Sequence, residues 1–309
     1  MSDDGGRFAI LRQNRGHLVS RPAGGLQVNA NGRADWIGWI DLKTEAVNEV
    51  STQNTARIIR DLAPDVLAVV EAENRPSLVR FSEDVLPTVG GTSFDNIMLV
   101  DGNDERGIDV GIMLRNGFTI DFMRSHVDDA DATGTIFSRD CAEYAITTPA
   151  GNRVFVLVNH FKSKGYGNAA TSNAKRRRQA QRVKDIYDAL VAAGEVNIAV
   201  VGDFNDTPPT NANSPLTPLL SQTNLQDITA HPLFVSDGRA GTYANGTASN
   251  KIDYVLLSPA LFALVTGGGI NRSGVWGGVN GTLFPHIPEV TTATEAASDH
   301  AAIFADITI

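Results

Sequence analysis

Short apolar runs, separated by polar segments rich in glycine, proline and asparagine, recur along the chain and predict a series of short strands. Residues 66–70 are apolar without interruption. Because such a run is typical of a strand whose two faces are covered, we expect this strand to be fully buried. The strands predicted from the pattern are 36–42, 66–70, 96–100, 110–114, 118–122, 142–147, 153–158, 196–201, 252–257 and 301–307.

Helical spacing of apolar residues occurs in fewer places. Ala56, Ile59 and Leu62 form one such stripe, and Pro64 ends it. The predicted helices are 54–62, 76–86, 174–193 and 216–220.

Two segments have neither pattern: residues 1–35 are irregular, and the glycine-rich residues 266–281 are predicted as a loop. Elsewhere strands outnumber helices, and strands are joined both by hairpin-like turns and by helices. This mixture predicts a layered α/β fold with mixed sheets and outer helices. No repeat and no long linker is visible, so we expect residues 1–309 to form a single domain.

The composition, with 42% hydrophobic and 20% charged residues in 309, is that of a globular protein. No apolar run approaches the roughly 18 residues of a membrane helix, and the polar start does not resemble a secretory signal. The single cysteine, Cys141, excludes an intramolecular disulfide. These features predict a cytoplasmic protein with no membrane partner.

The net charge of −9 argues against a non-specific nucleic-acid binder. Lys175-Arg176-Arg177-Arg178 is a local exception, which we interpret as the solvated first turns of a helix. Carboxylates gathered at a metal site would add to the negative total. A divalent ion would then offset them against a phosphate ester.

Chemically versatile side chains stand next to four of the predicted strands. Each has an ordinary explanation, because strands end in polar residues and because Gly, Asp and Asn favour turns. Together they offer carboxylates, imidazoles and an amide, which suit a metal and phosphate site. The four clusters are Glu71, Asn159-His160, Gly202-Asp203-Phe204-Asn205 and Ser298-Asp299-His300.

Asp253, near the start of the predicted strand 252–257, is a candidate partner for His300. A carboxylate that orients an imidazole would make His300 a base near neutral pH. Asp253 could equally pair with Lys251 or cap the preceding turn. Lys162, shortly after His160, would supply a point charge for a phosphate.

Several other chemistries lack their motifs. The chain has no Gly-x-Ser-x-Gly elbow, no Walker-type loop and no cysteine–histidine zinc cluster. Oxygen-rich clusters instead indicate Mg²⁺ or Mn²⁺, with Ca²⁺ as a further candidate.

Five ordered motifs resemble those of the endonuclease/exonuclease/phosphatase superfamily, the DNase I-like fold. The resemblance covers residues 54–309. The motifs are Val70-Glu71-Ala72-Glu73, Asn159-His160-Phe161-Lys162-Ser163, Gly202-Asp203-Phe204-Asn205, Ile252-Asp253-Tyr254 and Ser298-Asp299-His300.

The resemblance implies a four-layer sandwich, in which two mixed β-sheets pack face to face with helices on both outer sides. It also implies roles for individual residues. Glu71 and Asp299 resemble metal ligands, and His300 with Asp253 resembles the pair that activates water. Asp203 and Asn205 would position the nucleophile and the phosphate. His160 would stabilise the transition state, and Arg139 and Lys162 would contact the phosphate.

The chain departs from the family pattern at its start. Members normally begin with a short apolar strand that carries a metal-binding asparagine, and no such segment precedes Glu71 here. Asn14 is the only stand-in, and its neighbours match poorly, so residues 1–50 are an atypical N-terminal segment. The absent strand would leave an unpaired strand edge, through which two copies could pair as a homodimer.

The sequence therefore predicts a divalent-metal-dependent phosphoesterase that hydrolyses phosphodiesters, as a nuclease on DNA or RNA or as a small-molecule phosphodiesterase. Either His300 with Asp253, or Asp203, would activate the water. The alternatives are a phosphomonoesterase or phosphotriesterase using the same site, and a non-catalytic binding domain that has lost a metal ligand.

Overall fold

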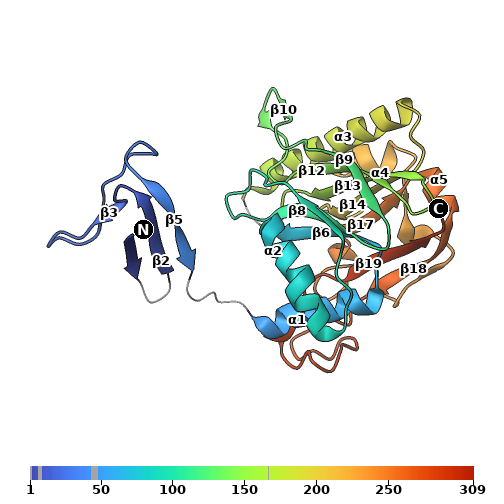
Figure 1. Ribbon diagram of the computed structural model, residues 1–309. Coiled ribbons are helices and arrows are strands. Elements are labelled where there is room, and N and C mark those ends of the chain that lie inside the picture. The colour runs from blue at the N-terminus through green and yellow to red at the C-terminus, as the bar shows by residue number, and fades with distance from the viewer. Residues whose placement is uncertain (1, 6–8, 43–47, 166) are drawn as a thin grey trace. The chain divides into compact units, whose positions relative to one another are not determined.

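The computed structural model describes residues 2–5, 9–42, 48–165 and 167–309, which form two compact units, Met1–Asn48 and Glu49–Ile309 (Figure 1). The division falls next to the end of the atypical segment 1–50. The assignment of residues 1–309 to a single domain stays a prediction.

The first unit consists of β-structure, although the pattern of residues 1–35 is irregular. Three antiparallel strands form a sheet in the order β1-β2-β5, and β3 and β4 form a separate hairpin. Asn14 lies at a bulge in β2 and is exposed. The strands are β1 (Ser2–Gly5), β2 (Ala9–Arg15), β3 (Val19–Ser20), β4 (Gln27–Val28) and β5 (Ile37–Leu42).

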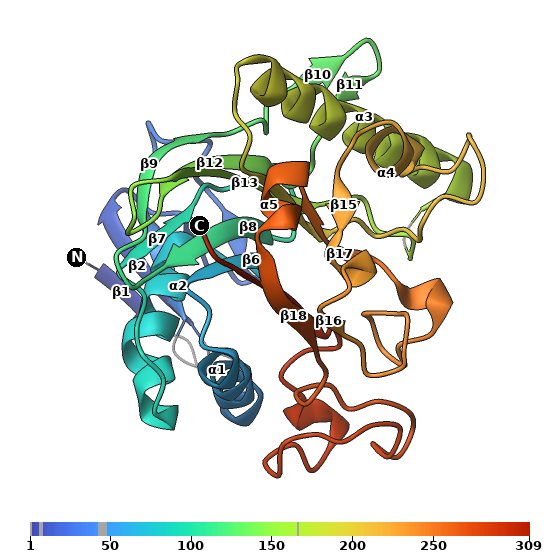
Figure 2. The same ribbon diagram turned by 90° about the vertical axis from the view of Figure 1, so that its right-hand side faces the viewer.

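A six-stranded mixed sheet forms the centre of the second unit (Figure 2). Only β13 and β14 run parallel in it, and the other neighbours are antiparallel. In order across the sheet the strands are β15 (Gln226–Asp227), β17 (Asp253–Leu257), β14 (Ile198–Asp203), β13 (Arg153–His160), β12 (Cys141–Thr147) and β9 (Thr119–Arg124).

Two three-stranded sheets pack against one face of this central sheet. Residues 266–281 were expected to be a loop, but β18 occupies the start of that segment because it pairs with β19. The first sheet has the order β6 (Val66–Ala72), β8 (Asp109–Leu114), β7 (Asn96–Leu99), and the second β16 (Phe234–Val235), β18 (Val265–Asn271), β19 (Ala302–Ile307). A small hairpin joins β10 (Ala130–Asp131) to β11 (Gly134–Thr135).

The main core lies between these layers. Val156 and Val201 of the central sheet share one hydrophobic cluster with Ile112 of β8, and side chains of β6 and β19 pack on it. On the opposite face of the central sheet, Val183 and Tyr187 of α3 pack in a second cluster. The mixed α/β class is therefore confirmed.

Helices lie outside the sheets. Ala56 of α1 packs in a third cluster beneath β7 and β8. The α-helices are α1 (Glu49–Leu62), α2 (Arg75–Arg80), α3 (Ala169–Ala192), α4 (Thr217–Ser221) and α5 (Pro259–Ala263). Shorter turns are the π-helix Phe81–Val85 and the 3₁₀ segments Leu86–Val89, Ile228–Ala230, Ala248–Asn250 and Ala293–Glu295. Within the described residues, every helix is too short or too polar to cross a membrane.

The basic block of α3 differs from its expected role as solvated turns. Arg176 is fully buried and pairs with Asp206 at 2.9 Å. Lys175 donates to Ser138 Oγ, Arg177 to backbone carbonyls, and Arg178 pairs with Asp131 at 2.6 Å. The solvated interpretation fails because α3 begins at Ala169, which places the block in its second and third turns, against the segments 131–138 and 206–214. The block therefore holds neighbouring loops in place.

The strand 66–70 was expected to be fully buried, and that prediction is wrong. Every residue of β6 is only half-buried or exposed, whereas all residues of β8 are buried. The physical reason is that β6 is the outer strand of its sheet, as β19 is of the other. β6 and β19 thus belong to two separate sheets and not to one continuous sheet.

A substitution of Gly202, at the end of β14, can test how closely β13 and β14 must approach each other. Its φ is +127°, and a Cβ atom there would lie 1.9 Å from the carbonyl oxygen of Asn159. We expect Gly202→Ala to lower the free energy of unfolding by about 2–6 kcal/mol, through backbone strain and overpacking. Urea denaturation measures this.

Gly151→Ala is the matched control for this substitution. Gly151 also has a positive φ, of +86°, but nothing lies within 4 Å of the position that a Cβ atom would take there. Only backbone strain remains, and it should cost about 1–2 kcal/mol. Equal losses in the two variants would show that the close approach to Asn159 does not constrain the fold.

Candidate active site

The predicted site residues meet because of the register between three neighbouring strands. In the parallel pair β13–β14, His160 is opposite Asp203, and in the antiparallel pair β14–β17, Asp203 is opposite Asp253. His300 shortly precedes β19 and is bonded to Asp253 across the layer. Residues far apart in the sequence therefore share one edge of the fold.

A stack of aromatic rings lies beneath these strand ends. Phe161 and Phe204 stack with ring centroids 4.9 Å apart, and Phe204 and Tyr254 with centroids 5.0 Å apart. All three are buried, and each directly follows a site residue. Such ring pairs contribute roughly 0.5–1.5 kcal/mol each beyond their burial. The stack holds the three motifs side by side.

His300 and Asp253 form the predicted pair. The distance from His300 Nδ1 to Asp253 Oδ2 is 2.9 Å, and Thr242 Oγ1 donates to the same oxygen at 2.5 Å. Ala301 N also donates to Thr242 O, so one loop holds both partners. Burial lowers the pKa of His300, but the hydrogen bond to Asp253 and the nearby carboxylates outweigh it and raise the pKa to about 9.

Asp203 is buried, and the turn after it binds its carboxylate. The backbone N of Asn205 donates to Oδ1 at 2.7 Å, and the Asn205 side-chain amide donates to Oδ2 at 2.8 Å. The same amide donates to Phe161 O, so Asn205 is committed to holding Asp203 and the neighbouring strand end. Burial, with the negative charge of Asp253, raises the pKa of Asp203 to about 7.

His160 is buried beside an arginine. Arg139 Nη2 lies 2.9 Å from His160 Nε2, and Arg139 Nε lies 3.3 Å from an oxygen of Asp104. Burial and the charge of Arg139 lower the pKa of His160 to about 3, so the imidazole is neutral at neutral pH. Hydrogen bonds from Arg106 and the charge of Arg139 lower the pKa of Asp104 to about 2, so it remains ionised.

Glu71 lies beside His160, and Asp299 lies beside His300. Glu71 lies at a bulge in β6 with φ +60°, a strained conformation of a kind that often marks functional positions. Its side chain is 60% exposed and lies 3.9 Å from His160 Nε2. Asp299 is 70% exposed and lies 4.0 Å from His300 Nε2.

One group of side chains has ligand atoms close enough together to hold a hard divalent cation. One ligand atom from each of Asp203, Asp253 and His300 lies within 4.8 Å of the others. However, Asp203 and Asp253 already accept hydrogen bonds from Asn205, Thr242 and the histidine, as in an acid–base relay. Within the described residues, no hydrogen bond to the carboxylate of Glu71 or Asp299 is present, so these oxygens are the more available for a cation.

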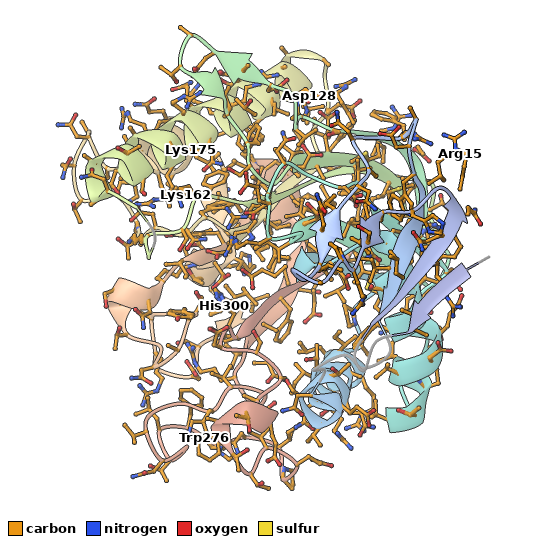
Figure 3. The ribbon with its side chains drawn as sticks, turned by 90° about the vertical axis from the view of Figure 1, so that its left-hand side faces the viewer. Arg15, Asp128, Lys162, Lys175, Trp276 and His300 are labelled. Atoms are coloured by element: carbon orange, nitrogen blue, oxygen red, sulfur yellow. The ribbon has the colours of Figure 1, made fainter. Side chains whose placement is uncertain are left out.

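Basic side chains lie beside the site on the α3 side. In Figure 3, Lys162 lies between Lys175 and His300. Buried Arg176 donates to Lys162 O at 2.9 Å, and Lys162 N donates to buried Gln179, so the backbone at Lys162 is held firmly. Lys162 is two residues after His160, and Arg139 contacts the His160 ring, so both basic residues belong to the His160 end of the row.

The structure thus brings together Glu71, His160, Asp203, Asp253 and His300, with Arg139, Lys162, Asn205 and Asp299 adjacent. Their chemical roles stay predictions. Sequence reasoning missed Asp104 and Thr242, which bind Arg139 and Asp253. Asp104 lies in an acidic loop without strand or helix pattern, and only its spacing from Arg106 hinted at an ion pair. Sequence reasoning also overlooked the aromatic residue in each of three motifs, which are Phe161, Phe204 and Tyr254.

Comparison with known proteins shows the family to which this fold belongs. The model of the Endonuclease/Exonuclease/phosphatase family matches residues 37–267, which include Glu71, His160, Asp203 and Asp253. The search of curated proteins found no match.

Solved structures share the fold at low sequence identity. An endonuclease/exonuclease/phosphatase from Bacteroides vulgatus aligns over 84% of this chain and 91% of its own, with TM-score 0.58 and 17% identity. The mannosyl-6-phosphatase of Bacteroides thetaiotaomicron aligns over 84% and 91%, with TM-score 0.55 and 15% identity. Truncated TDP2 from Caenorhabditis elegans aligns over 82% and 88%, with TM-score 0.54 and 15% identity. The match to the family model, supported by this shared fold, shows that the chain belongs to the endonuclease/exonuclease/phosphatase family.

Proposed function

We propose that this protein is a divalent-metal-dependent phosphoesterase that cleaves phosphodiesters. Members of its family are phosphoester hydrolases. The observation that carries the proposal is the hydrogen bond between His300 Nδ1 and Asp253, beside buried Asp203 and neutral His160. This arrangement joins a base, its orienting carboxylate and a group for the developing charge at one edge of the fold.

Water activation falls to one of two groups. Asp253 fixes the ring of His300 through Nδ1, which leaves Nε2 as the nitrogen that can take a proton. Because the pKa of His300 is about 9 without a metal ion, this role requires the bound cation to favour the neutral imidazole. Asp203 is the second candidate, because its raised pKa brings it close to neutral pH, where a carboxylate becomes an effective base. Hydrogen bonds from Asn205 hold the Asp203 carboxylate in position for this role.

Glu71 and Asp299 would hold the metal ion, which when bound would neutralise phosphate charge and polarise the ester. Both side chains are exposed and carry hard oxygen donors, which suit Mg²⁺ or Mn²⁺, or Ca²⁺ as a weaker fit. Neutral His160, whose Nε2 accepts a hydrogen bond from Arg139, would stabilise the charge that develops on a phosphoryl oxygen by holding the guanidinium beside it. Arg139 and Lys162 supply positive charge on the same side.

The charge distribution favours a small phosphodiester over DNA or RNA. Phosphate contacts from many free lysines and arginines supply most nucleic-acid affinity. Here the six basic residues of α3 already have intramolecular partners, and the net charge is −9. We therefore propose a small ester as substrate, with nucleic acid as the alternative.

Hydrolysis of bis-(p-nitrophenyl) phosphate with Mn²⁺ tests the proposed function. We expect His300→Ala and Asp253→Asn each to lower kcat/KM by about 100-fold or more, since each removes proton transfer or its orientation. EDTA should abolish the activity. p-Nitrophenyl phosphate, assayed in parallel, separates diesterase from monoesterase activity.

His231→Ala is the matched control, because His231 packs on Phe262 of α5 and makes no contact with the site residues described above. It should leave kcat/KM unchanged. Hydrolysis that survives both EDTA and His300→Ala would refute the mechanism, and absence of both activity and Mn²⁺ binding would favour the non-catalytic domain.

Metal binding should depend on pH. Below its raised pKa, Asp203 holds a proton, and His300 is protonated below about pH 9 in the metal-free protein. Because a cation favours the deprotonated forms, Mn²⁺ binding should release protons, and its affinity should rise from about pH 6 to about pH 9. Titration calorimetry in two buffers of different ionisation enthalpy measures the release.

Asp203→Asn should reduce this proton release near neutral pH, because the amide cannot titrate. The comparison must include the binding of Mn²⁺ itself, so that a lost site is not mistaken for a lost proton. A Mn²⁺ affinity that is constant across this pH range would contradict the raised pKa values of Asp203 and His300.

Asp104 is predicted to position Arg139. Asp104→Asn removes the charge that holds the guanidinium, so we expect KM to rise by roughly tenfold or more, with a smaller change in kcat. Asp131→Asn removes the partner of Arg178 in a more exposed pair and should change neither constant. Steady-state kinetics, with urea denaturation to check folding, decides the matter. If KM is unchanged in a folded Asp104→Asn protein, Arg139 does not bind the substrate phosphate.

A further inference from the structure

A cavity of about 740 Å³ lies between the two three-stranded sheets. Residues of both β6 and β19 line it: Val66, Leu67, Ala68 and Val70 on one strand, and Ala302 to Ile307 on the other. Residues at its rim include Asp203, Asp253 and His300, so one end of the cavity adjoins the candidate active site.

Within the second unit, both bordering strands present an unpaired edge. Within the described strands, β6 pairs only with β8, and β19 pairs only with β18. Their inner side chains nevertheless belong to one layer, since Ala68 and Val70 of β6 and Ile303 and Ala305 of β19 pack on the same hydrophobic cluster. The cavity therefore interrupts a single layer between two edges whose backbone donors and acceptors can each take a partner strand.

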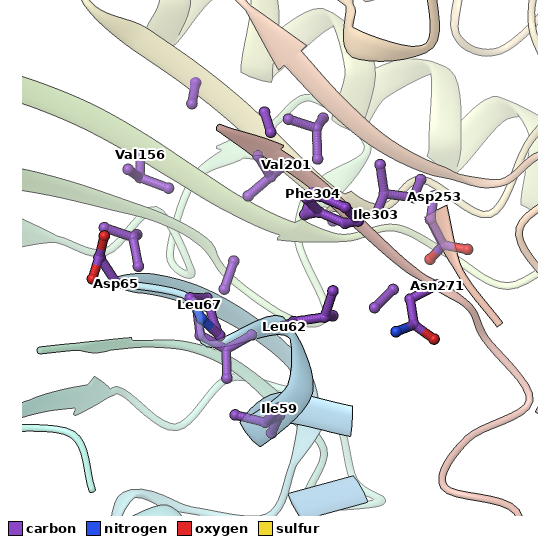
Figure 4. Close-up of a pocket in the computed structure, with 18 of the residues that line it drawn as sticks. Ile59, Leu62, Asp65, Leu67, Val156, Val201, Asp253, Asn271, Ile303 and Phe304 are labelled. Atoms are coloured by element: carbon purple, nitrogen blue, oxygen red, sulfur yellow. The ribbon is translucent and has the colours of Figure 1, made fainter. Parts of the chain in front are cut away.

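The two walls of the cavity are apolar. Val156 and Val201 of the central sheet form one wall, and Ile59 and Leu62 of α1 form the other, as Figure 4 shows. A group lying between these walls would be covered on both faces. An extended chain in this place must therefore carry apolar side chains on both faces, as a central strand does.

The composition of β6 and β19 points to the same conclusion. Residues 66–70 are uninterruptedly apolar, which is typical of an interior strand, yet every residue of β6 is only half-buried or exposed. β19 is similarly apolar, and its residues are likewise half-buried or exposed. Both strands have the sequence of interior strands and the exposure of edge strands.

The ends of the cavity are charged. Asp65 precedes β6 and Asp306 lies near the end of β19, and both line the cavity, whereas Asp203 and Asp253 lie at the active-site end. β6 runs toward the active site and β19 runs away from it, because Glu71 lies near the end of one and His300 precedes the other. An inserted strand would thus be parallel to one edge and antiparallel to the other. A basic residue at the end next to Asp65 and Asp306 would complement their charge.

We propose that this cavity binds one extended peptide strand of a partner, which pairs with β6 and β19 at once. The lengths of these strands, seven and six residues, set the length of the bound segment. Its centre is apolar on both faces, and its end beside Asp65 and Asp306 is basic. Because β6 carries Glu71 and β19 follows His300, the bound strand also ties together the two halves of the candidate active site.

Other occupants satisfy fewer of these features. A small apolar ligand would suit the volume but would leave the backbone groups of both edges without partners. A second copy that extended one sheet edge to edge would pair with β6 or with β19, but not with both. One strand between the two edges satisfies the backbone and the apolar walls together.

Selection from a displayed library of random peptides, roughly nine residues long, on the immobilised full chain tests the proposal. We expect enriched sequences with consecutive apolar residues in the centre and lysine or arginine at one end. Hydrogen exchange with the best synthetic peptide should then slow by about tenfold or more at amides of both 66–72 and 302–307. Amides of β9, an edge strand of the central sheet, should be unaffected.

Two arginine substitutions provide the matched variants. Ala68→Arg places a long charged side chain in the cavity and should weaken peptide binding about tenfold or more, whereas Val279→Arg, at a position 96% exposed, should not. If Ala68→Arg does not fold, the exchange measurement on the unaltered chain decides alone.

Several results would overturn the proposal. These are a selection without such a consensus, and protection at only one of the two edges. Protection of both edges that appears with rising protein concentration and no peptide would instead assign the cavity to a second copy. Octyl glucoside that excludes the peptide without protecting the edge amides would assign it to an apolar small molecule.

Discussion

The stacking of Phe161, Phe204 and Tyr254 is the contact on which the arrangement of the site depends. Each ring sits next to a polar site residue on its own strand end, and all three are buried, with centroid spacings of 4.9 and 5.0 Å. The stack fixes the height of three strand ends relative to one another. Gly202 allows the same ends to approach, because no side chain fits between it and the Asn159 carbonyl.

Hydrogen bonds then hold the charged groups at this edge. Thr242 and His300 bind Asp253, Asn205 binds Asp203, and Arg139 lies between Asp104 and His160. Burial shifts the pKa of Asp203 upward and that of His160 downward, which separates the protonation behaviour of neighbouring groups. Such divergence between adjacent titratable groups is typical of sites that transfer protons.

The interrupted layer between β6 and β19 also affects the candidate active site. The strained turn at Glu71 lies at the end of one unpaired edge, and Asp299 and His300 precede the other. Their relative position therefore rests on the central sheet and on α1, whose Thr55 and Ser51 donate to carbonyls of the segment before Ser298. A strand between the two edges would join these halves directly through backbone hydrogen bonds.

The sequence by itself determined the mixed α/β class, most strand positions and the residues that gather at the site. Local patterns carry this information, because apolar runs report strands and polar residues mark their ends. Only the tertiary structure decided that β6 and β19 are edges, that Arg176 is buried and that Asp104 holds Arg139. The physical reason is that edge exposure, ion pairing and pKa depend on which segments become neighbours, and neither the composition nor the periodicity of one segment specifies its neighbours.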